Sequence, residues 1–162
     1  MQDMLVKLYE LPNPAAALET MSRQGVVIRP ALNLEKPRIL EWVRLTFPVW
    51  VAEAESAFCR LPVSCFIAVR DSELVGFACY DVTCRNYFGP SGVQTGEQRR
   101  GIGRALLLAT LYAQRTQGYA YAIIGGVGPR EFYEKSVGAT LIEGSDPGIY
   151  DKALFAQRPG SR

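Results

Sequence analysis

The feature that most constrains the fold is the stretch over residues 97–139, where a glycine turn opens an apolar helix. We expect this helix to run from about Gly103 to Gln117. An apolar strand over 120–126 and a short helix over 129–138 follow it. Along the chain, the expected elements begin with strands and continue in the order β-α-β-α-β. We therefore expect an α/β domain built around one mixed sheet.

The remainder of the chain supplies further helices and strands. Asn13 and Gly25 bracket a capped helix, and Pro48 divides a second helical region into two. The other expected elements are a helix over 14–24, a strand over 26–30, helices over 34–47 and 49–58, a hairpin of strands over 64–71 and 74–82 that turns at Ser72-Glu73, a strand over 87–93, and a last hairpin over 139–150.

Length and composition fit one globular domain. The chain has 162 residues, of which 48% are hydrophobic and 21% charged, and its net charge is +2. Binding of nucleic acid or membrane requires a concentrated basic surface, so neither partner is expected. Charged residues interrupt the first segment, so we expect no signal peptide and a cytoplasmic location. We divide the chain into a helical extension over 1–25, a main domain over 26–151 and a frayed tail over 152–162.

Four cysteines and the absence of histidine limit the chemistry. No CxxC spacing occurs among the four cysteines, Cys59, Cys65, Cys79 and Cys84. We therefore expect reduced thiols and no metal site. Without histidine the commonest general base near neutral pH is missing. Catalytic triads of the Ser-His-Asp kind are therefore excluded.

The glycine turn has the properties of a phosphate-binding site. Gly101 and Gly103 lack Cβ atoms, so a ligand can approach the backbone closely. The next helix exposes unpaired N–H groups at the positive end of its dipole, and Arg99, Arg100 and Arg104 surround that point. The dinucleotide fingerprint and the Walker A loop both fail to match. An ordinary helix start with surface arginines is the alternative interpretation.

The segment Gln98–Gly103, QRRGIG, resembles the Q/R-x-x-G-x-G/A motif of the GCN5-related N-acetyltransferase (GNAT) superfamily. The stretch FYEKSVGA, with Tyr133, is similar to that superfamily's FYEKLGF, and the order of elements from about Val26 to Tyr150 follows it. The resemblance implies a GNAT-type α/β (α+β) fold. That fold has a mixed, mostly antiparallel central sheet flanked by helices, with a splayed strand pair that binds acyl-CoA.

The resemblance also implies an N-acetyltransferase that transfers an acetyl group from acetyl-CoA, its cosubstrate, to a primary amine by direct attack. The N–H of Val93 would stabilise the oxyanion, and the hydroxyl of Tyr133 would assist the departing thiolate. A core aromatic is the alternative for Tyr133. The residues implied to bind the cofactor are Ser91, Gly92, Val93, Arg99, Arg100, Gly101, Ile102, Gly103 and Arg104.

Two positions depart from the family pattern. Gly126 stands where the family often has an asparagine that contacts the cofactor, and Pro129 replaces the usual alanine. This turn would therefore have to reach the cofactor through backbone groups, or not at all. A catalytically idle acyl-CoA-binding or regulatory domain is thus an alternative function, and a phosphate binder unrelated to CoA is a third.

Asp81 is the candidate general base. Strand alternation would place it on one face with Val75, Phe77 and Cys79, and such apolar neighbours would raise its pKa. A turn aspartate exposed to water is the alternative.

Glu53 and Glu55, in helices expected to cover the substrate, are weaker candidates for the base and could bind a cationic acceptor. Trp42, Trp50 and Tyr80 could line an acceptor pocket, with core packing as the alternative. The acceptor is expected to be a small-molecule or peptide amine. The first quarter of the chain could cover the acceptor site, extend a homodimer or pack on the sheet.

Overall fold

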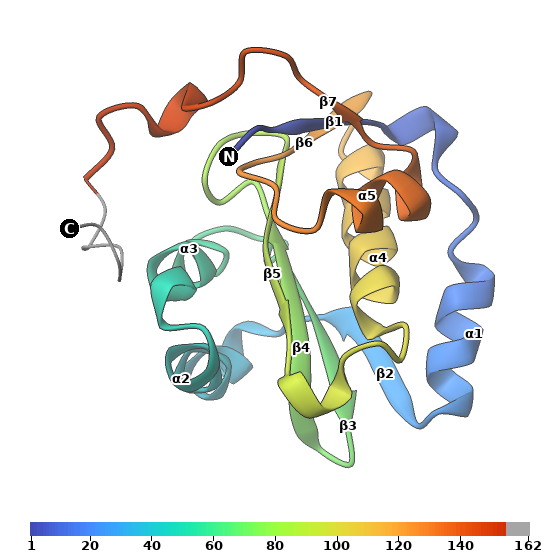
Figure 1. The fold of residues 1–162 in the computed structure, drawn as a ribbon. Coiled ribbons are helices and arrows are strands. Elements are labelled where there is room, and N and C mark those ends of the chain that lie inside the picture. Colours follow the sequence, from blue (N-terminus) through green and yellow to red (C-terminus); the bar gives the residue numbers. More distant parts are fainter. Residues whose placement is uncertain (155–162) are drawn as a thin grey trace.

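The structure is a computed structural model that describes residues 1–154. A seven-stranded sheet runs through it with helices on both faces (Figure 1). The strands are β1 (Met4–Lys7), β2 (Val26–Pro30), β3 (Cys65–Arg70), β4 (Glu73–Tyr80), β5 (Tyr87–Val93), β6 (Tyr121–Ile124) and β7 (Thr140–Leu141). The helices are α1 (Ala15–Arg23), α2 (Lys36–Thr46), α3 (Val51–Ser56), α4 (Ile102–Thr116) and α5 (Arg130–Val137).

The sheet is mixed and mostly antiparallel, as the sequence predicted. Its strand order is β2-β3-β4-β5-β6-β1-β7. Every neighbouring pair is antiparallel except β5 and β6, which run parallel. Helix α4 supplies the crossover that this parallel pair requires.

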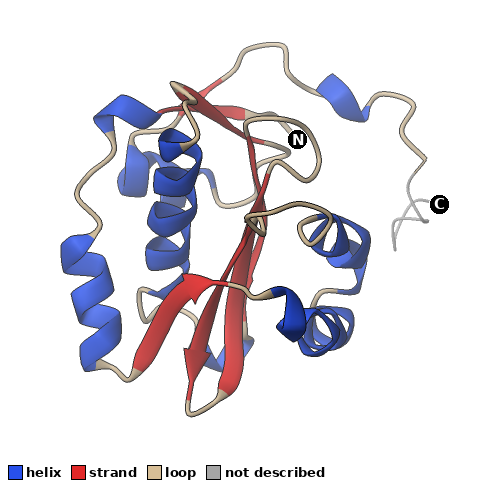
Figure 2. Ribbon diagram, turned by 180° about the vertical axis from the view of Figure 1, so that it is seen from behind, coloured by secondary structure: helices blue, strands red, loops and turns tan. Residues whose placement is uncertain are grey.

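Each face of the sheet carries its own hydrophobic core. Helices α1 and α4 cover one face and α2 and α3 cover the other (Figures 1 and 2). Leu106 and Leu107 of α4 pack with Ala78 on the first face, whereas Val43 of α2 packs with Phe77 on the second. Because both faces of β4 are covered, seven of its eight residues are buried.

The predicted helices and strands between residues 14 and 137 form close to their expected bounds. The β3–β4 hairpin turns at Asp71 and Ser72, whose φ angles are 50° and 65°, one residue earlier than expected. The predicted hairpin over 139–150 is wrong. Only Thr140–Leu141 is a strand there, and it pairs with β1, because Pro147 and the positive φ of Gly144 interrupt extended structure.

The N-terminal segment contains a strand that the sequence analysis did not predict. β1 lies in the sheet between β6 and β7, and α1 packs beside α4. The segment over residues 1–25, predicted to be helical, therefore contains a strand of the sheet as well as a helix. The domain boundaries at residues 25 and 151 stay predictions, and most of the predicted tail lies outside the described residues.

Among the helices that the structure describes, none combines the length and apolar character needed to cross a membrane.

Candidate functional site

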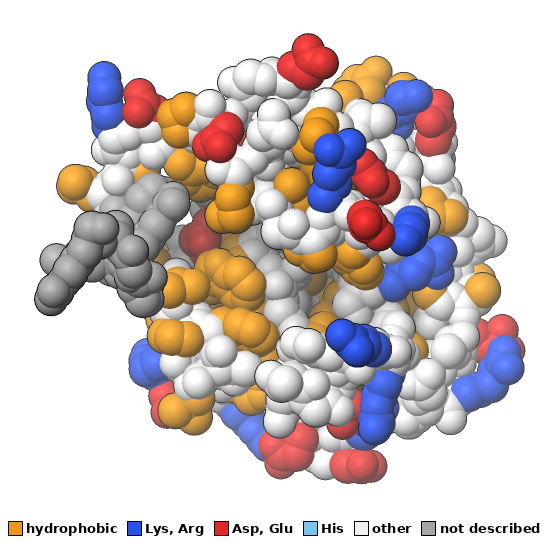
Figure 3. Space-filling model, in the orientation of Figure 1, with side chains coloured by type: hydrophobic (Ala, Val, Ile, Leu, Met, Phe, Trp, Pro, Cys, Tyr) orange, Lys and Arg blue, Asp and Glu red, His pale blue; other side chains and the backbone are white. Residues whose placement is uncertain are grey.

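The parallel strands β5 and β6 pair over only two residues. Tyr87 pairs with Ile123 and Phe88 with Ile124, after which β6 ends while β5 continues to Val93. The sheet therefore splits beyond Phe88, as expected of a splayed strand pair. A cavity of about 870 Å³ opens at this split. Figure 3 shows this hollowed face of the molecule, with many hydrophobic side chains around the hollow.

The free edge of β5 presents backbone groups to the cavity. The N–H of Gln94 donates to the carbonyl of Val75 on β4 at 3.0 Å. Because successive residues of a strand direct their backbone groups to opposite sides, those of Val93 and Ser91 face away from β4, toward the split. The Gln98 side-chain amide donates to the Val93 carbonyl at 3.1 Å. The N–H of Val93 thus lies at the edge where an extended ligand could pair.

The glycine turn opens onto the same cavity. Gly101 precedes α4 with a φ of 92°, a left-handed conformation that glycine adopts without strain. The first N–H groups of α4 have no partner within the helix, and they carry the positive end of its dipole. Arg99, Gly103 and Arg104 line the cavity beside them. This arrangement suits a phosphate or diphosphate group.

Two of the predicted cofactor-binding residues do not line the cavity. The Arg100 side chain lies 3.5 Å from Glu97, a carboxylate that also pairs with Arg70 on β3. The Ile102 side chain is buried in the core beneath α4. Ile102 can therefore offer a ligand only its backbone groups, whereas the Arg100 side chain stays half-exposed beside the turn. Ser91, Gly92, Val93, Arg99, Gly101, Gly103 and Arg104 do line the cavity.

Tyr133 of α5 lines the cavity opposite this edge, and its side chain is largely buried. Its ring packs edge-on against Phe88 and Phe132, with ring centroids 6.2 and 5.0 Å away. Burial raises the pKa of Tyr133, and a hydrogen bond with the Ser91 side chain opposes that rise. At neutral pH the phenol is therefore protonated and can donate.

At the turn around Gly126, where the family often has asparagine, the backbone N–H groups form hydrogen bonds within the protein. The N–H of Gly126 donates to the Asp3 carboxylate at 2.8 Å, and that of Val127 donates to the Gln2 carbonyl at 2.9 Å. The sequence left two possibilities open: the turn contacts the cofactor through backbone groups, or it does not contact the cofactor. This geometry favours no contact. The two amides bind the N-terminal segment and so are occupied before any ligand arrives.

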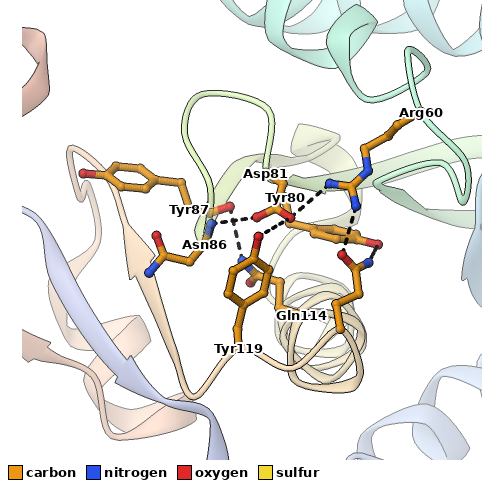
Figure 4. A network of polar contacts seen from close by, with 8 residues as sticks. Arg60, Tyr80, Asp81, Asn86, Tyr87, Gln114 and Tyr119 are labelled. Carbon is orange, nitrogen blue, oxygen red and sulfur yellow. Dashed lines mark hydrogen bonds and ion pairs between the residues drawn. The ribbon is translucent and has the colours of Figure 1, made fainter.

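Asp81 lies outside the cavity wall, in a polar network (Figure 4). Its side chain is 2% exposed and lies 3.1 Å from Arg60. It also accepts a hydrogen bond from the Asn86 N–H at 2.7 Å and another from the Tyr119 hydroxyl at 3.1 Å. All these partners hold the turn between β4 and β5. A catalytic role for Asp81 stays a prediction.

The strand alternation used for Asp81 is wrong, because β4 contains an extra residue at Val75. The register shifts opposite Ala68 and Val69, and Val75 packs in the α4 core while Phe77 packs in the other. A second shift lies between Ala78 and Tyr80. Asp81 itself follows the strand with a φ of 56°. The first shift places Val75 on the other face from Phe77 and Cys79, and the second adds its extra residue to β5.

The end of the cavity away from the glycine turn is lined by aromatic and acidic side chains that sequence reasoning largely missed. Trp50, Glu53, Phe77, Tyr87 and Tyr150 line it. Trp50 and Glu53 were considered from the sequence, whereas no local signal pointed to the others. Trp42 and Tyr80 do not line it; the Tyr80 hydroxyl accepts a hydrogen bond from Gln117 at 2.7 Å.

No group of three or more Cys, Asp or Glu side chains within residues 1–154 is arranged to hold a metal ion.

Comparison with solved structures supports the fold. A GCN5-related glucosamine N-acetyltransferase region of a fungal multi-domain GH3 β-N-acetylglucosaminidase matches with a TM-score of 0.73 and 13% identity, over 87% of this chain and 19% of that chain. A GCN5-related N-acetyltransferase from Sphaerobacter thermophilus matches with a TM-score of 0.64 and 19% identity, over 87% and 48% of the two chains. This chain thus spans about a fifth of the first protein and about half of the second.

A third solved structure is the aminoglycoside acetyltransferase meta-AAC0020 from an uncultured soil metagenomic sample, in complex with trehalose. It matches with a TM-score of 0.54 and 17% identity, over 70% of this chain and 88% of that chain. At such identities these likenesses show a shared fold. A search of curated protein sequences found no match.

The sequence profile described as the Acetyltransferase (GNAT) family matches residues 35–139. The match covers more than half of the chain and includes the free edge of β5, the glycine turn and Tyr133. The chain therefore belongs to the GNAT acetyltransferase family.

Proposed function

We propose that this protein is an N-acetyltransferase that transfers the acetyl group of acetyl-CoA to a primary amine by direct attack. One observation carries the proposal: the glycine turn, the free edge of β5 and the Tyr133 side chain all line a single cavity. An anion site, an extended binding edge and a proton donor are thereby arranged along one path. A cytoplasmic location and use of no metal belong to the same proposal.

The chain's residues fit acetyl-CoA in two places. The N–H groups at the start of α4, with Arg99 and Arg104, would hold the diphosphate. The edge of β5 from Ser91 to Val93 would pair with the extended pantetheine arm, as a strand would. The Val93 N–H would then donate to the thioester oxygen and stabilise the negative charge that develops there.

Tyr133 would assist the leaving group. When the amine nitrogen bonds to the acetyl carbon and the carbon–sulfur bond breaks, the thiolate needs a proton, which the Tyr133 hydroxyl would supply. A phenol near pKa 10 and a thiol near 8.5 differ by about 1.5 units, so full transfer is uphill by about 2 kcal/mol. Burial raises the pKa of Tyr133 and increases this cost. We therefore expect a hydrogen bond that strengthens as charge builds, with proton transfer late.

The amine must lose protons to become the amide. Glu53 is an acidic side chain on the cavity wall, whereas Asp81 is not on it. We assign the proton acceptor to Glu53, directly or through water. The Tyr133 phenolate would regain its proton from solvent.

The test is a thiol-release assay with acetyl-CoA and a panel of primary amines. The proposal predicts amine-dependent release of CoA together with the acetylated amine. If CoA binds but no amine accelerates thiol release above hydrolysis, the protein is an idle acyl-CoA-binding domain and the proposal fails.

A further inference from the structure

The cavity carries opposite charges at its two ends. At one end Arg99 and Arg104 lie beside the start of α4; we call this the basic end. At the other, Glu53 of α3 is the one acidic side chain among the described residues that line the cavity. We call the part lined by Trp50, Glu53, Phe77, Tyr87 and Tyr150 the acidic end.

Glu53 lacks a cationic partner within the described chain. The Thr83 hydroxyl donates a hydrogen bond to its Oε1, and the described residues provide no hydrogen bond or ion pair to Oε2. Glu55, two residues along the same helix, is instead paired with Lys36 at 3.0 Å and lies outside the cavity. A half-buried carboxylate without a counter-charge favours a cationic ligand, because that ligand restores the interaction lost with water.

The side chains around Glu53 are aromatic and held in place by packing. The Trp50 ring stacks on Phe47 with centroids 5.1 Å apart and an interplanar angle of 29°. It also lies 6.4 Å from the Phe77 ring. Such fixed aromatic faces suit an apolar or aromatic body.

Two tyrosines complete the acidic end, packed over Gly125. A Cβ placed on Gly125 would lie 2.6 Å from the Tyr150 hydroxyl and 2.9 Å from the Tyr87 ring. The buried Asp3 carboxylate accepts a hydrogen bond from the Tyr87 hydroxyl at 3.2 Å. Burial, together with the charge of Asp3, raises the pKa of both Tyr87 and Tyr150 to about 12. Both phenols therefore stay neutral at physiological pH.

Asp3 does not offer a second contact for a cation. Its side chain is buried, outside the cavity lining, and its two oxygens accept from Gly126 and Tyr87. A ligand in the acidic end thus meets one carboxylate and several apolar faces. Only one ammonium group of an acceptor can pair with this carboxylate. In an acceptor with several ammonium groups, the others would lose their contacts with water and gain no carboxylate in return, which costs binding free energy.

We propose that the acceptor is a monoamine: a primary amine with one positive charge on an apolar or aromatic body. Its ammonium group binds Glu53, and its body lies between Trp50 and Tyr87. This inference rests on the proposed function, because it places the amine at the end of the cavity opposite the diphosphate. It adds a selectivity, monoamines over polyamines, that membership of the family does not supply.

The experiment measures amine binding to the CoA-loaded protein, so that no reaction is required. CoA is first titrated into the protein by calorimetry; absence of binding there contradicts the proposed function. Phenethylamine, spermidine and phenethyl alcohol are then titrated into the saturated complex. The first carries one charge on an aromatic body, the second carries several charges without an aromatic body, and the third is an uncharged analogue of the first.

We expect phenethylamine to bind at least tenfold more tightly than either comparison ligand. Glu53→Gln keeps the shape of the side chain and removes its charge, so it should weaken phenethylamine binding about tenfold or more. Glu55→Gln, the matched control on the same helix, should change it less than twofold. Normal CoA binding in both variants shows that each is folded.

Three results would overturn the inference while leaving the proposed function intact. In the first, CoA binds but spermidine binds as tightly as phenethylamine or more tightly. In the second, phenethyl alcohol binds as well as the amine. In the third, Glu53→Gln and Glu55→Gln have equal effects.

Discussion

The Gln98 side-chain amide donates a hydrogen bond to the carbonyl oxygen of Val93 at 3.1 Å. Gln98 belongs to the glycine turn and Val93 to the free edge of β5, so this bond joins the two parts that would hold the diphosphate and the pantetheine arm. It also occupies the Val93 carbonyl beside the N–H proposed to stabilise the oxyanion. The two binding segments are thereby held in a fixed relation before any ligand arrives.

Removing this bond should weaken cofactor binding more than it weakens the fold. Gln98→Ala deletes one exposed hydrogen bond, which contributes about 1 kcal/mol to stability. We expect CoA affinity to fall several-fold by calorimetry, because the edge and the turn can then move independently. Gln94→Ala, an exposed control in the same loop whose backbone N–H bond is kept, should leave the affinity unchanged. Equal affinities for the two variants would contradict this role of Gln98.

The two glycines of the turn should respond differently to alanine. Gly101 has a φ of 92°, and a Cβ there would lie 3.2 Å from the Met21 side chain. Left-handed backbone costs an alanine about 1–2 kcal/mol, so Gly101→Ala should lower the melting temperature by roughly 3–6 °C and weaken CoA binding.

Gly103→Ala is the matched control for stability. A Cβ at Gly103 would meet Val93 and Phe132 at 3.7 and 3.8 Å, which are ordinary contacts, and its φ is not in the left-handed region. Alanine also favours a helix by about 1 kcal/mol over glycine. Thermal unfolding should therefore show Gly103→Ala at least as stable as the wild type. A loss of stability equal to that of Gly101→Ala would contradict the assignment of the turn.

Tyr133→Phe should separate catalysis from binding. The substitution removes only the hydroxyl, so CoA affinity should change less than twofold while kcat falls about 10²-fold or more, the usual contribution of a general acid. The assay is steady-state thiol release, with CoA titration in parallel. Tyr121→Phe, at an exposed position outside the cavity, is the control. Unchanged turnover in Tyr133→Phe would remove the hydroxyl from the mechanism.

Asp81→Asn should act mainly on stability. The nearly buried carboxylate takes part in three polar contacts, and asparagine removes its charge and one acceptor oxygen. Leaving a buried donor unsatisfied costs about 1–3 kcal/mol, so the free energy of unfolding in urea should fall by that amount. Asp71→Asn, in an exposed turn, should change it little. If instead Asp81→Asn unfolds normally and abolishes amine-dependent turnover, Asp81 is the general base after all.

Much of the site's basic end could be predicted from the sequence, because its parts are local. Gly101 and the helix after it are adjacent in the chain, and their backbone groups create the anion site without help from distant segments. Tyr133 follows at the spacing that the superfamily shows. The sheet class was also predictable, since strand patterns and helix signals recur in order along the chain.

The acidic end could not be predicted in this way, because distant segments build it. Tyr150 and Tyr87 meet over Gly125, and Asp3 joins them from the segment just before β1. No periodicity links these positions. Asp81 shows the complementary failure: alternation is a sound rule for a regular strand, but an extra residue at Val75 separates that side chain from Phe77 and Cys79, and Asp81 itself lies beyond the end of β4.

The most direct test of the account is a calorimetric titration of the wild-type protein with CoA, repeated with Gly101→Ala. The account predicts saturable binding of one CoA per chain that Gly101→Ala weakens, since the N–H groups after the glycine turn would hold the diphosphate. No heat of binding with the wild type, or equal affinities for the two proteins, would contradict it.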